Sequence, residues 1–288
     1  MQRQSLLPNI VSLVLKDAWM PKTSSDDAFL RGRTALITGG LSGVGFAIAK
    51  KLAAHGANVA IGSRRVETGE VSSIVSQLSS FGTRVHAAPL DVRDGASVEA
   101  FMRAVEAAIS PIDILVNAAG ITAEQGVDGH SDALWDHILD TNLNGAFRMT
   151  RACLPGMIQR GWGRIINIGS TAATVGWKDN PAYCASKAGL LGLTRCVALE
   201  GAPHGVSCTM ISPTWVETEL MHTNTAELAE REGRGRTSAD IMADIKAQNP
   251  QKRIIQPEEV AATAGFLCRD EAMGLSMDNI QITGGALW

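Results

Sequence analysis

The residues of this chain best suited to chemistry are a tyrosine and a lysine four positions apart. Tyr183 and Lys187 lie in the run Tyr183-Cys184-Ala185-Ser186-Lys187, and Ser170 stands thirteen residues upstream. On a helix that spacing places both side chains on one face, one turn apart. An ammonium near a phenol favours the phenolate and lowers a pKa that is about 10 when unperturbed. Such a pair predicts a general acid/base for interconverting a carbonyl and an alcohol near neutral pH.

Composition limits the classes of protein to which the chain can belong. Its 288 residues, 45% hydrophobic, suffice for one large α/β domain with a sizeable core. The net charge of −3, without a basic block, argues against a nucleic-acid partner. Five cysteines are scattered without a C-x-x-C pair, which predicts reduced thiols, a cytoplasmic location and no metal site. No apolar run is long enough to span a bilayer, so we expect no membrane partner.

The first thirty residues differ from the rest. Residues 6–15 are apolar, and residues 21–27 resemble a linker. We interpret residues 1–30 as an N-terminal extension that packs on its own domain or on another subunit. Export or membrane contact is the alternative, although no small-residue cleavage site follows the apolar run. The main domain is predicted over residues 31–288.

A glycine-rich turn is predicted between the first strand and the first helix. Residues 34–38 form a short apolar run, residues 38–45 read Thr-Gly-Gly-Leu-Ser-Gly-Val-Gly, and a helical stretch continues to about His55. Glycines permit a tight turn and close backbone approach, and a helix N-terminus attracts a pyrophosphate. Strand, turn and helix together therefore predict a dinucleotide site, with a merely structural turn as the alternative.

The end of the second predicted strand indicates which dinucleotide binds. Residues 58–62 form this strand, followed by Ser63, Arg64 and Arg65, with Glu67 beyond them. An acid at this place accepts from the ribose of NAD, whereas an arginine meets the 2′-phosphate of NADP. We therefore expect NADP(H) to be preferred, with NAD(H) possible.

Further strands and helices alternate along the rest of the chain. Strands are predicted at residues 85–90, 112–116, 164–168, 206–211 and 279–282. Helices are predicted at about 67–81, 94–109, 131–144, 183–199 and 257–268, and a further helix follows residue 144 and ends at about residue 160. Seven strands alternating with helices predict a single-domain α/β fold, a Rossmann-type doubly wound sheet of seven parallel strands. Residues 214–253 carry two helical patches, at 225–231 and 238–248, and are interpreted as a helical substrate lid with Gly233 and Gly235 as hinges.

Several motifs in order resemble the short-chain dehydrogenase/reductase (SDR) family from about residue 31 to the C-terminus. The family's T-G-x-x-x-G-x-G is present as Thr38, Gly39, Gly43 and Gly45, and its N-N-A-G as Asn117, Ala118, Ala119 and Gly120. Its active-site asparagine, serine and Y-x-x-x-K pair match Asn142, Ser170, Tyr183 and Lys187. The resemblance implies further cofactor contacts from Leu41, Ser42, Val44, Ser63, Arg64, Arg65, Asp91, Val92, Pro213, Val216 and Thr218.

The resemblance also implies a mechanism and an assembly. Ser170 and Tyr183 hydrogen-bond the substrate oxygen, Tyr183 transfers the proton, and Lys187 lowers the pKa of the tyrosine and binds the nicotinamide ribose. Asn142 holds a water that relays protons to Lys187. A homotetramer is expected. Two departures, Thr214 after Pro213 and Thr283 before the last glycine pair, leave the proton-transfer residues untouched.

The lid is similar to that of 3-hydroxybutyrate dehydrogenases, but their polar clamp is not reproduced. The matching positions hold Thr122, Ala172, Asn180 and Asn224, where the family carries glutamine, histidine, lysine and glutamine. Trp177, Trp215 and Met221 are predicted beside them and offer apolar and aromatic surface. We expect a neutral, bulky ketone or secondary alcohol, for example a cyclic or aromatic one, or an acyl thioester whose charge lies outside the pocket. The alternatives are an NAD-dependent 3-hydroxybutyrate or 3-hydroxyacyl dehydrogenase and a non-catalytic, cofactor-sensing binding protein.

Overall fold

The computed structural model describes residues 28–64, 66, 70–233 and 235–286. Its strands are β1 (Thr34–Thr38), β2 (Asn58–Ser63), β3 (Val85–Pro89), β4 (Ile114–Asn117), β5 (Gly163–Ile168), β6 (Val206–Pro213) and β7 (Asn279–Ile282). Its α-helices are α1 (Gly43–Ala54), α2 (Glu70–Ser79), α3 (Gly95–Ala108), α4 (Asp132–Leu139), α5 (Gly145–Arg160), α6 (Pro181–Gly201), α7 (Glu219–Glu232), α8 (Ser238–Gln248) and α9 (Pro257–Leu267).

All the strand pairs are parallel, in the order β3-β2-β1-β4-β5-β6-β7. The predicted seven-stranded parallel sheet is therefore confirmed. β1 pairs with β2 on one side and with β4 on the other, so the direction of winding reverses there. In open parallel sheets ligands bind outside the carboxyl ends of the strands at such a reversal.

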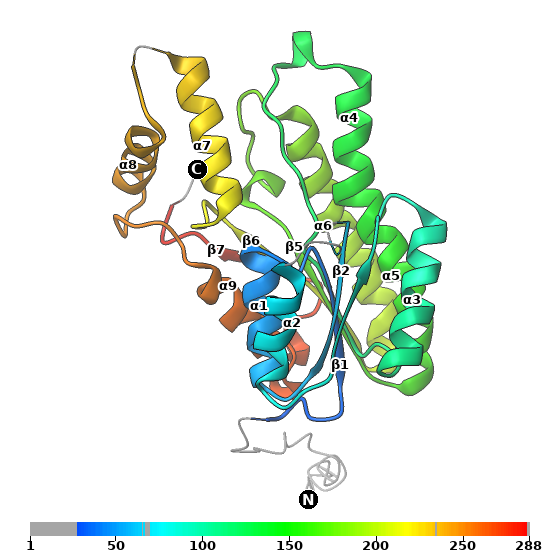
Figure 1. Ribbon diagram of the computed structural model, residues 1–288. Helices are drawn as coiled ribbons and strands as arrows, with labels where there is room; N and C mark the ends of the chain where they lie inside the picture. The colour runs from blue at the N-terminus through cyan, green and yellow to red at the C-terminus, as the bar shows by residue number, and fades with distance from the viewer. Residues whose placement is uncertain (1–27, 65, 67–69, 234, 287–288) are drawn as a thin grey trace, which may run out of the picture.

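Helices cover both faces of the sheet, and each face has its own apolar core (Figure 1). On one face α1 and α9 pack through residues such as Ile48, Leu52 and Ala264. On the other face α3, α5 and α6 pack through residues such as Phe101 and Met149. Continuous apolar strands are expected where a parallel sheet is covered on both faces. α7 and α8 stand apart from these layers, beyond the carboxyl ends of the strands (Figure 1).

The described residues just before Arg31 pack against the main domain. Leu30 is 1% exposed and belongs to the same apolar core as α1. Its backbone N–H donates to the carbonyl of His55 at the end of α1. The apolar stretch at residues 6–15 lies outside the described residues, so its packing stays a prediction.

The helical part of the lid segment, residues 214–253, is longer than its apolar pattern suggested. α7 begins at Glu219 because Thr218 caps it, accepting from the N–H of Met221 at 3.3 Å. α8 starts with a capping box in which Thr237 and Asp240 satisfy each other's backbone N–H groups. No helix in the described part of the chain is long and apolar enough to cross a membrane.

Candidate active site

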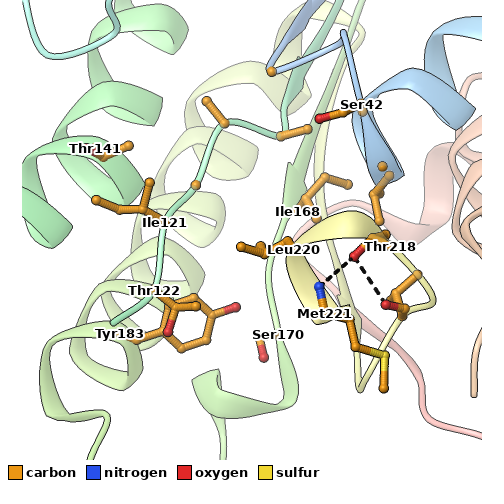
Figure 2. Close-up of a pocket in the computed structure, with 18 of the residues that line it drawn as sticks. Ser42, Ile121, Thr122, Thr141, Ile168, Ser170, Tyr183, Thr218, Leu220 and Met221 are labelled. Atoms are coloured by element: carbon orange, nitrogen blue, oxygen red, sulfur yellow. Dashed lines mark hydrogen bonds between the residues drawn. The ribbon is translucent and has the colours of Figure 1, made fainter. Parts of the chain in front are cut away.

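A cavity of about 680 Å³ lies at the carboxyl ends of the strands, between the sheet and α7 (Figure 2). It runs from the end of β2 to Tyr183. Of the predicted residues, those that line it are Gly39, Ser42, Gly43, Val44, Gly45, Ser63, Arg64, Asp91, Val92, Ala118, Ala119, Gly120, Thr122, Ser170, Trp177, Asn180, Tyr183, Lys187, Pro213, Trp215, Val216, Thr218 and Met221. One cavity therefore joins both predicted halves of the site.

The glycine-rich turn has the backbone for which glycine is required. Gly39 has φ of +67°, and a Cβ there would stand 3.1 Å from the Cα of Ala119. A Cβ on Gly45 would stand 2.4 Å from the carbonyl oxygen of Gly39. Ser42, the N-cap of α1, makes no side-chain capping hydrogen bond. The first N–H groups of α1 are thus left to a ligand, which suits an anion at this helix N-terminus.

Three predicted cofactor residues lie beneath the cavity and do not line it. The Thr38 hydroxyl accepts from the N–H groups of Ala118 and Ala119, at 3.1 and 3.0 Å, and so joins the ends of β1 and β4. The Asn117 amide donates to Asn167 and Thr150 within the sheet. Leu41 packs against the apolar core of α1. These residues shape the turn, and direct contacts from them to the cofactor stay a prediction.

The far end of the cavity carries charged groups. Arg64 is exposed at the end of β2, and Arg65 lies outside the described residues. The guanidinium of Arg93, which the sequence analysis missed, binds both oxygens of Asp91, with Nε 2.9 Å from Oδ1 and Nη2 2.5 Å from Oδ2. This contact lowers the pKa of Asp91 to about 2. An arginine two residues after the acid was the available signal.

Asn142 sits in a π-helical turn, Asp140–Asn144, between α4 and α5. Its amide accepts from the N–H of Ile121 and donates to the carbonyl of the same residue, both at 2.8 Å, and it also donates to Ser186 at 3.1 Å. Asn142 thus ties the segment after β4 to α6. The helix predicted over residues 131–144 is interrupted here, and π-turns of this kind are frequent at functional sites.

Ser170 and Tyr183 face the same space in the cavity (Figure 2). Desolvation raises the pKa of Tyr183, and a hydrogen bond with Ser170 lowers it by a smaller amount. The net shift is upward, whereas the sequence predicted that Lys187 would lower this pKa. The Lys187 ammonium lies 5.6 Å from the centre of the tyrosine ring and donates to the carbonyl of Ile168 at 2.8 Å. Burial lowers the pKa of Lys187 to about 8.

The substrate end of the cavity combines uncharged polar groups with aromatic surface. The hydroxyl of Thr122 donates to the Asn180 side chain at 2.9 Å. Trp177 and Trp215 form an edge-to-face pair. Ala172, predicted beside them, is 3% exposed and does not line the cavity. Lining residues that the sequence analysis did not single out include Ile121, Glu124, Thr141, Ile168, Leu220 and Thr223.

Comparison with known proteins places the chain in a family. The short chain dehydrogenase family matches residues 33–229, so this chain belongs to the short-chain dehydrogenases/reductases, oxidoreductases that act on CH–OH and C=O groups. A D-beta-hydroxybutyrate dehydrogenase of Cupriavidus necator is 36% identical over 90% of this chain and 96% of its own length. The 3-oxoacyl-(acyl-carrier-protein) reductase FabG of Escherichia coli is 35% identical over 88% of this chain and 97% of its own.

Solved structures agree with this assignment. A variant of actinorhodin polyketide ketoreductase, solved with NADPH, superposes with a TM-score of 0.83 at 32% identity, covering 88% of this chain and 96% of that chain. The names of these relatives give different substrates. Family membership therefore defines the reaction type but does not identify the substrate, which has to be inferred from the residues that line the cavity.

The residues present fit a nicotinamide dinucleotide. The N-terminus of α1 lacks a side-chain cap, the turn before it has no Cβ at Gly39 or Gly43, and Arg64 stands at the far end of the same cavity. These features suit a pyrophosphate at the helix and a further anionic group near Arg64. Tyr183 and Lys187 stand at the opposite end, where the reacting ring of such a molecule would be required.

Proposed function

We propose that the chain is an NADP(H)-preferring oxidoreductase that interconverts a neutral, bulky ketone and its secondary alcohol. The observation that carries the proposal is the pair of hydroxyls, Ser170 and Tyr183, on one cavity wall with the buried Lys187 ammonium behind them. When bound, the nicotinamide supplies or accepts the hydride.

The protein's own residues provide orientation and the proton. Ser170 and Tyr183 are placed to hydrogen-bond one substrate oxygen, and the Tyr183 phenol donates its proton to that oxygen in the reduction. The positive field of Lys187, 5.6 Å from the ring centre, stabilises the phenolate that remains. In this proposal Asn142 positions the backbone of Ile121 and the side chain of Ser186, because its amide is hydrogen-bonded to both. Any relay water held by Asn142 would be additional to these contacts.

The preference for a neutral substrate rests on the groups around the Tyr183 end of the cavity. Thr122, Asn180 and Asn224 are uncharged, and Thr122 and Asn180 already bond each other. Of the acids that line the cavity, Glu124 is paired with Arg231 of α7. The one cation among the lining residues at this end, Lys187, already donates to the carbonyl of Ile168, so a substrate carboxylate would leave water without a cationic partner of its own, which is costly. The hydroxybutyrate-type activity of a relative is the competing proposal.

The deciding experiment is turnover of a ketone and alcohol panel with NADPH and with NADH. We expect hydrophobic ketones to exceed acetoacetate and 3-hydroxybutyrate in kcat/KM. A tenfold advantage for the small acids would overturn the neutral-substrate proposal. Tyr183→Phe should lower turnover by about 10²–10⁴-fold while NADPH binding persists. Near-wild-type turnover by this variant would refute the assigned role of Tyr183, and NADPH binding without turnover of any panel member by the wild type would favour a binding protein.

We also propose a homotetramer in the cytoplasm. Phe147 on α5, Trp135 on α4 and Phe266 on α9 are 45%, 36% and 48% exposed, so both helical faces present large apolar side chains to an interface. All five cysteines are free, which suits a reducing compartment. Light scattering that gives a monomer at micromolar concentration would contradict the assembly.

A further inference from the structure

Two tryptophan rings stand between the active-site cavity and a second cavity. The ring centroids of Trp177 and Trp215 are 5.5 Å apart, with the planes at 75°. Both rings line the cavity of about 680 Å³ that holds Tyr183, and both also line a neighbouring cavity of about 430 Å³. Thr214 is the other residue common to both walls. These three residues are thus the wall that the two cavities have in common.

Each ring is mounted on a different loop, and each loop is tied to the framework of the site. The N–H of Trp177 donates to the sulfur of Cys184, the residue after the catalytic tyrosine, at 3.4 Å. The carbonyl of Trp215 accepts from the N–H of Ile255 at 3.3 Å, next to the bridge between Val216 and Ile255. The position of both rings relative to Tyr183 is thus set by backbone contacts on either side of the cavity.

The second cavity has apolar surface on part of its wall and charged and polar side chains on the rest. Leu228 of α7, Ile241 and Ile245 of α8, and Ile254 supply apolar walls. The guanidinium of Arg236, which also lines it, is engaged by Glu232 and Asp244 from the same two helices. An apolar chain that passed the two tryptophan rings would contact this apolar surface. Glu232 and Asp244 would not be left without a charged partner, because both are paired with Arg236.

We propose that Trp177 and Trp215 form a partition that sets the upper length of the substrate. The apolar arm of the ketone ends against the two tryptophan rings, which prevent the substrate from extending into the second cavity. This inference rests on the proposed function and narrows its substrate class to compact, cyclic or aromatic ketones rather than long acyl chains. Trp177 and Trp215 are then specificity-determining residues.

The test removes each ring singly, in Trp177→Ala and Trp215→Ala, and measures kcat/KM with NADPH for straight-chain methyl ketones from butanone to undecanone. In the wild type kcat/KM should rise with chain length and then fall once the chain meets the rings. In the variants it should continue to rise, by roughly three- to fourfold for each added methylene that becomes buried. The longest ketone should gain at least about tenfold relative to butanone.

Two controls separate a partition from a general loss of packing. Trp135→Ala makes the same change on α4, where the ring packs against His130 and lines neither cavity, and it should leave the chain-length profile unchanged. Ile245→Phe fills the second cavity from behind. It should cancel the gain of Trp215→Ala and have no effect on the profile when both tryptophans are present.

An unchanged profile in both alanine variants, or a gain that Ile245→Phe does not cancel, would overturn the partition. If an alanine variant does not fold, Trp215→Leu replaces it. Should the wild type turn over no ketone, the proposed function fails, and the partition is tested by binding instead. Undecanone with saturating NADPH should then raise the melting temperature of Trp215→Ala more than that of the wild type, and an equal shift would refute the inference.

Discussion

Replacing Lys187 with methionine should stabilise the cofactor-free protein at neutral pH. Lys187 is 5% exposed, and burial lowers its pKa from 10.5 to about 8. The ammonium form is thus disfavoured in the folded state, by about 3 kcal/mol at 1.36 kcal/mol for each pKa unit. Methionine removes that cost but also removes the hydrogen bond to the carbonyl of Ile168, worth about 1–2 kcal/mol. A net gain of about 1–2 kcal/mol remains.

The pH dependence gives the sharper test because its sign is fixed. Between pH 8 and 10.5 the lysine of the unfolded chain keeps its proton while the folded one has lost it. Stability rises with pH wherever the unfolded state binds more protons. The wild type should therefore recover about 2 kcal/mol relative to Lys187→Met between about pH 7 and 9.5. The advantage of the variant at neutral pH should shrink accordingly.

Urea unfolding of both proteins at fixed concentration, without cofactor, measures this difference. Buried thiols such as Cys153 and Cys268, whose pKa values burial raises to about 12, titrate with the opposite sign, but equally in both proteins. The comparison of the two cancels them. A stability difference that does not change with pH, or a variant less stable than the wild type by about 2 kcal/mol at pH 7, would refute the assigned burial cost.

Three further outcomes follow from the site. Tyr183 is the single tyrosine, so its ionisation can be followed alone by near-ultraviolet absorbance. We expect its pKa to be above 10 without cofactor, and higher still in Ser170→Ala, which loses the hydrogen bond that lowers it. A pKa below 10 would contradict the effect assigned to desolvation. Arg64→Ala should weaken NADPH binding by about tenfold or more and NADH binding little, as calorimetry can check, and equal losses would show that Arg64 does not read the 2′-phosphate. Arg231→Ala breaks the pair with Glu124 that joins α7 to the segment after β4, and it should raise the KM for the ketone by about two- to fivefold without changing NADPH affinity. The control is Arg236→Ala, which breaks ion pairs within the lid segment. An equal rise in KM in the control would show that Arg231 has no special role.

Local patterns predicted the sheet and the catalytic helix because both depend on short-range chemistry. Thr34–Thr38 is fully apolar or β-branched and lies inside the sheet, between β2 and β4, with every residue buried. Asp94 caps α3 by accepting from the N–H of Ala96, two residues further along the chain. The four-residue spacing of Tyr183 and Lys187 placed both side chains on one helix face. In each case the signal and its structural consequence lie within a few residues of each other.

Properties that depend on depth or on distant partners could not be predicted in the same way. Spacing indicated that Lys187 stands near Tyr183, but only the fold shows that desolvation of the phenol outweighs its hydrogen bond with Ser170. Glu124 meets Arg231 from a position 107 residues away, and nothing local announces that pair. Thr38 matched a cofactor motif, yet its hydroxyl is occupied by Ala118 and Ala119. A motif shows which residues occupy the positions of a site, whereas burial and competing hydrogen bonds determine which of their groups are free to bind a ligand.

The opposite pKa shifts of the catalytic pair have a common origin. Desolvation favours the neutral form of each group, so it raises the pKa of Tyr183 and lowers that of Lys187. The uncharged pair is therefore the form that burial alone favours. A charged pair gains the attraction between ammonium and phenolate, which is stronger where water is excluded. Because Lys187 has no acidic partner among the described residues, its field is left for the charge that forms on the Tyr183 oxygen. The cost of burying the lysine and its proposed role in proton transfer thus follow from one arrangement, and a substitution that relieves the cost should abolish the proton transfer.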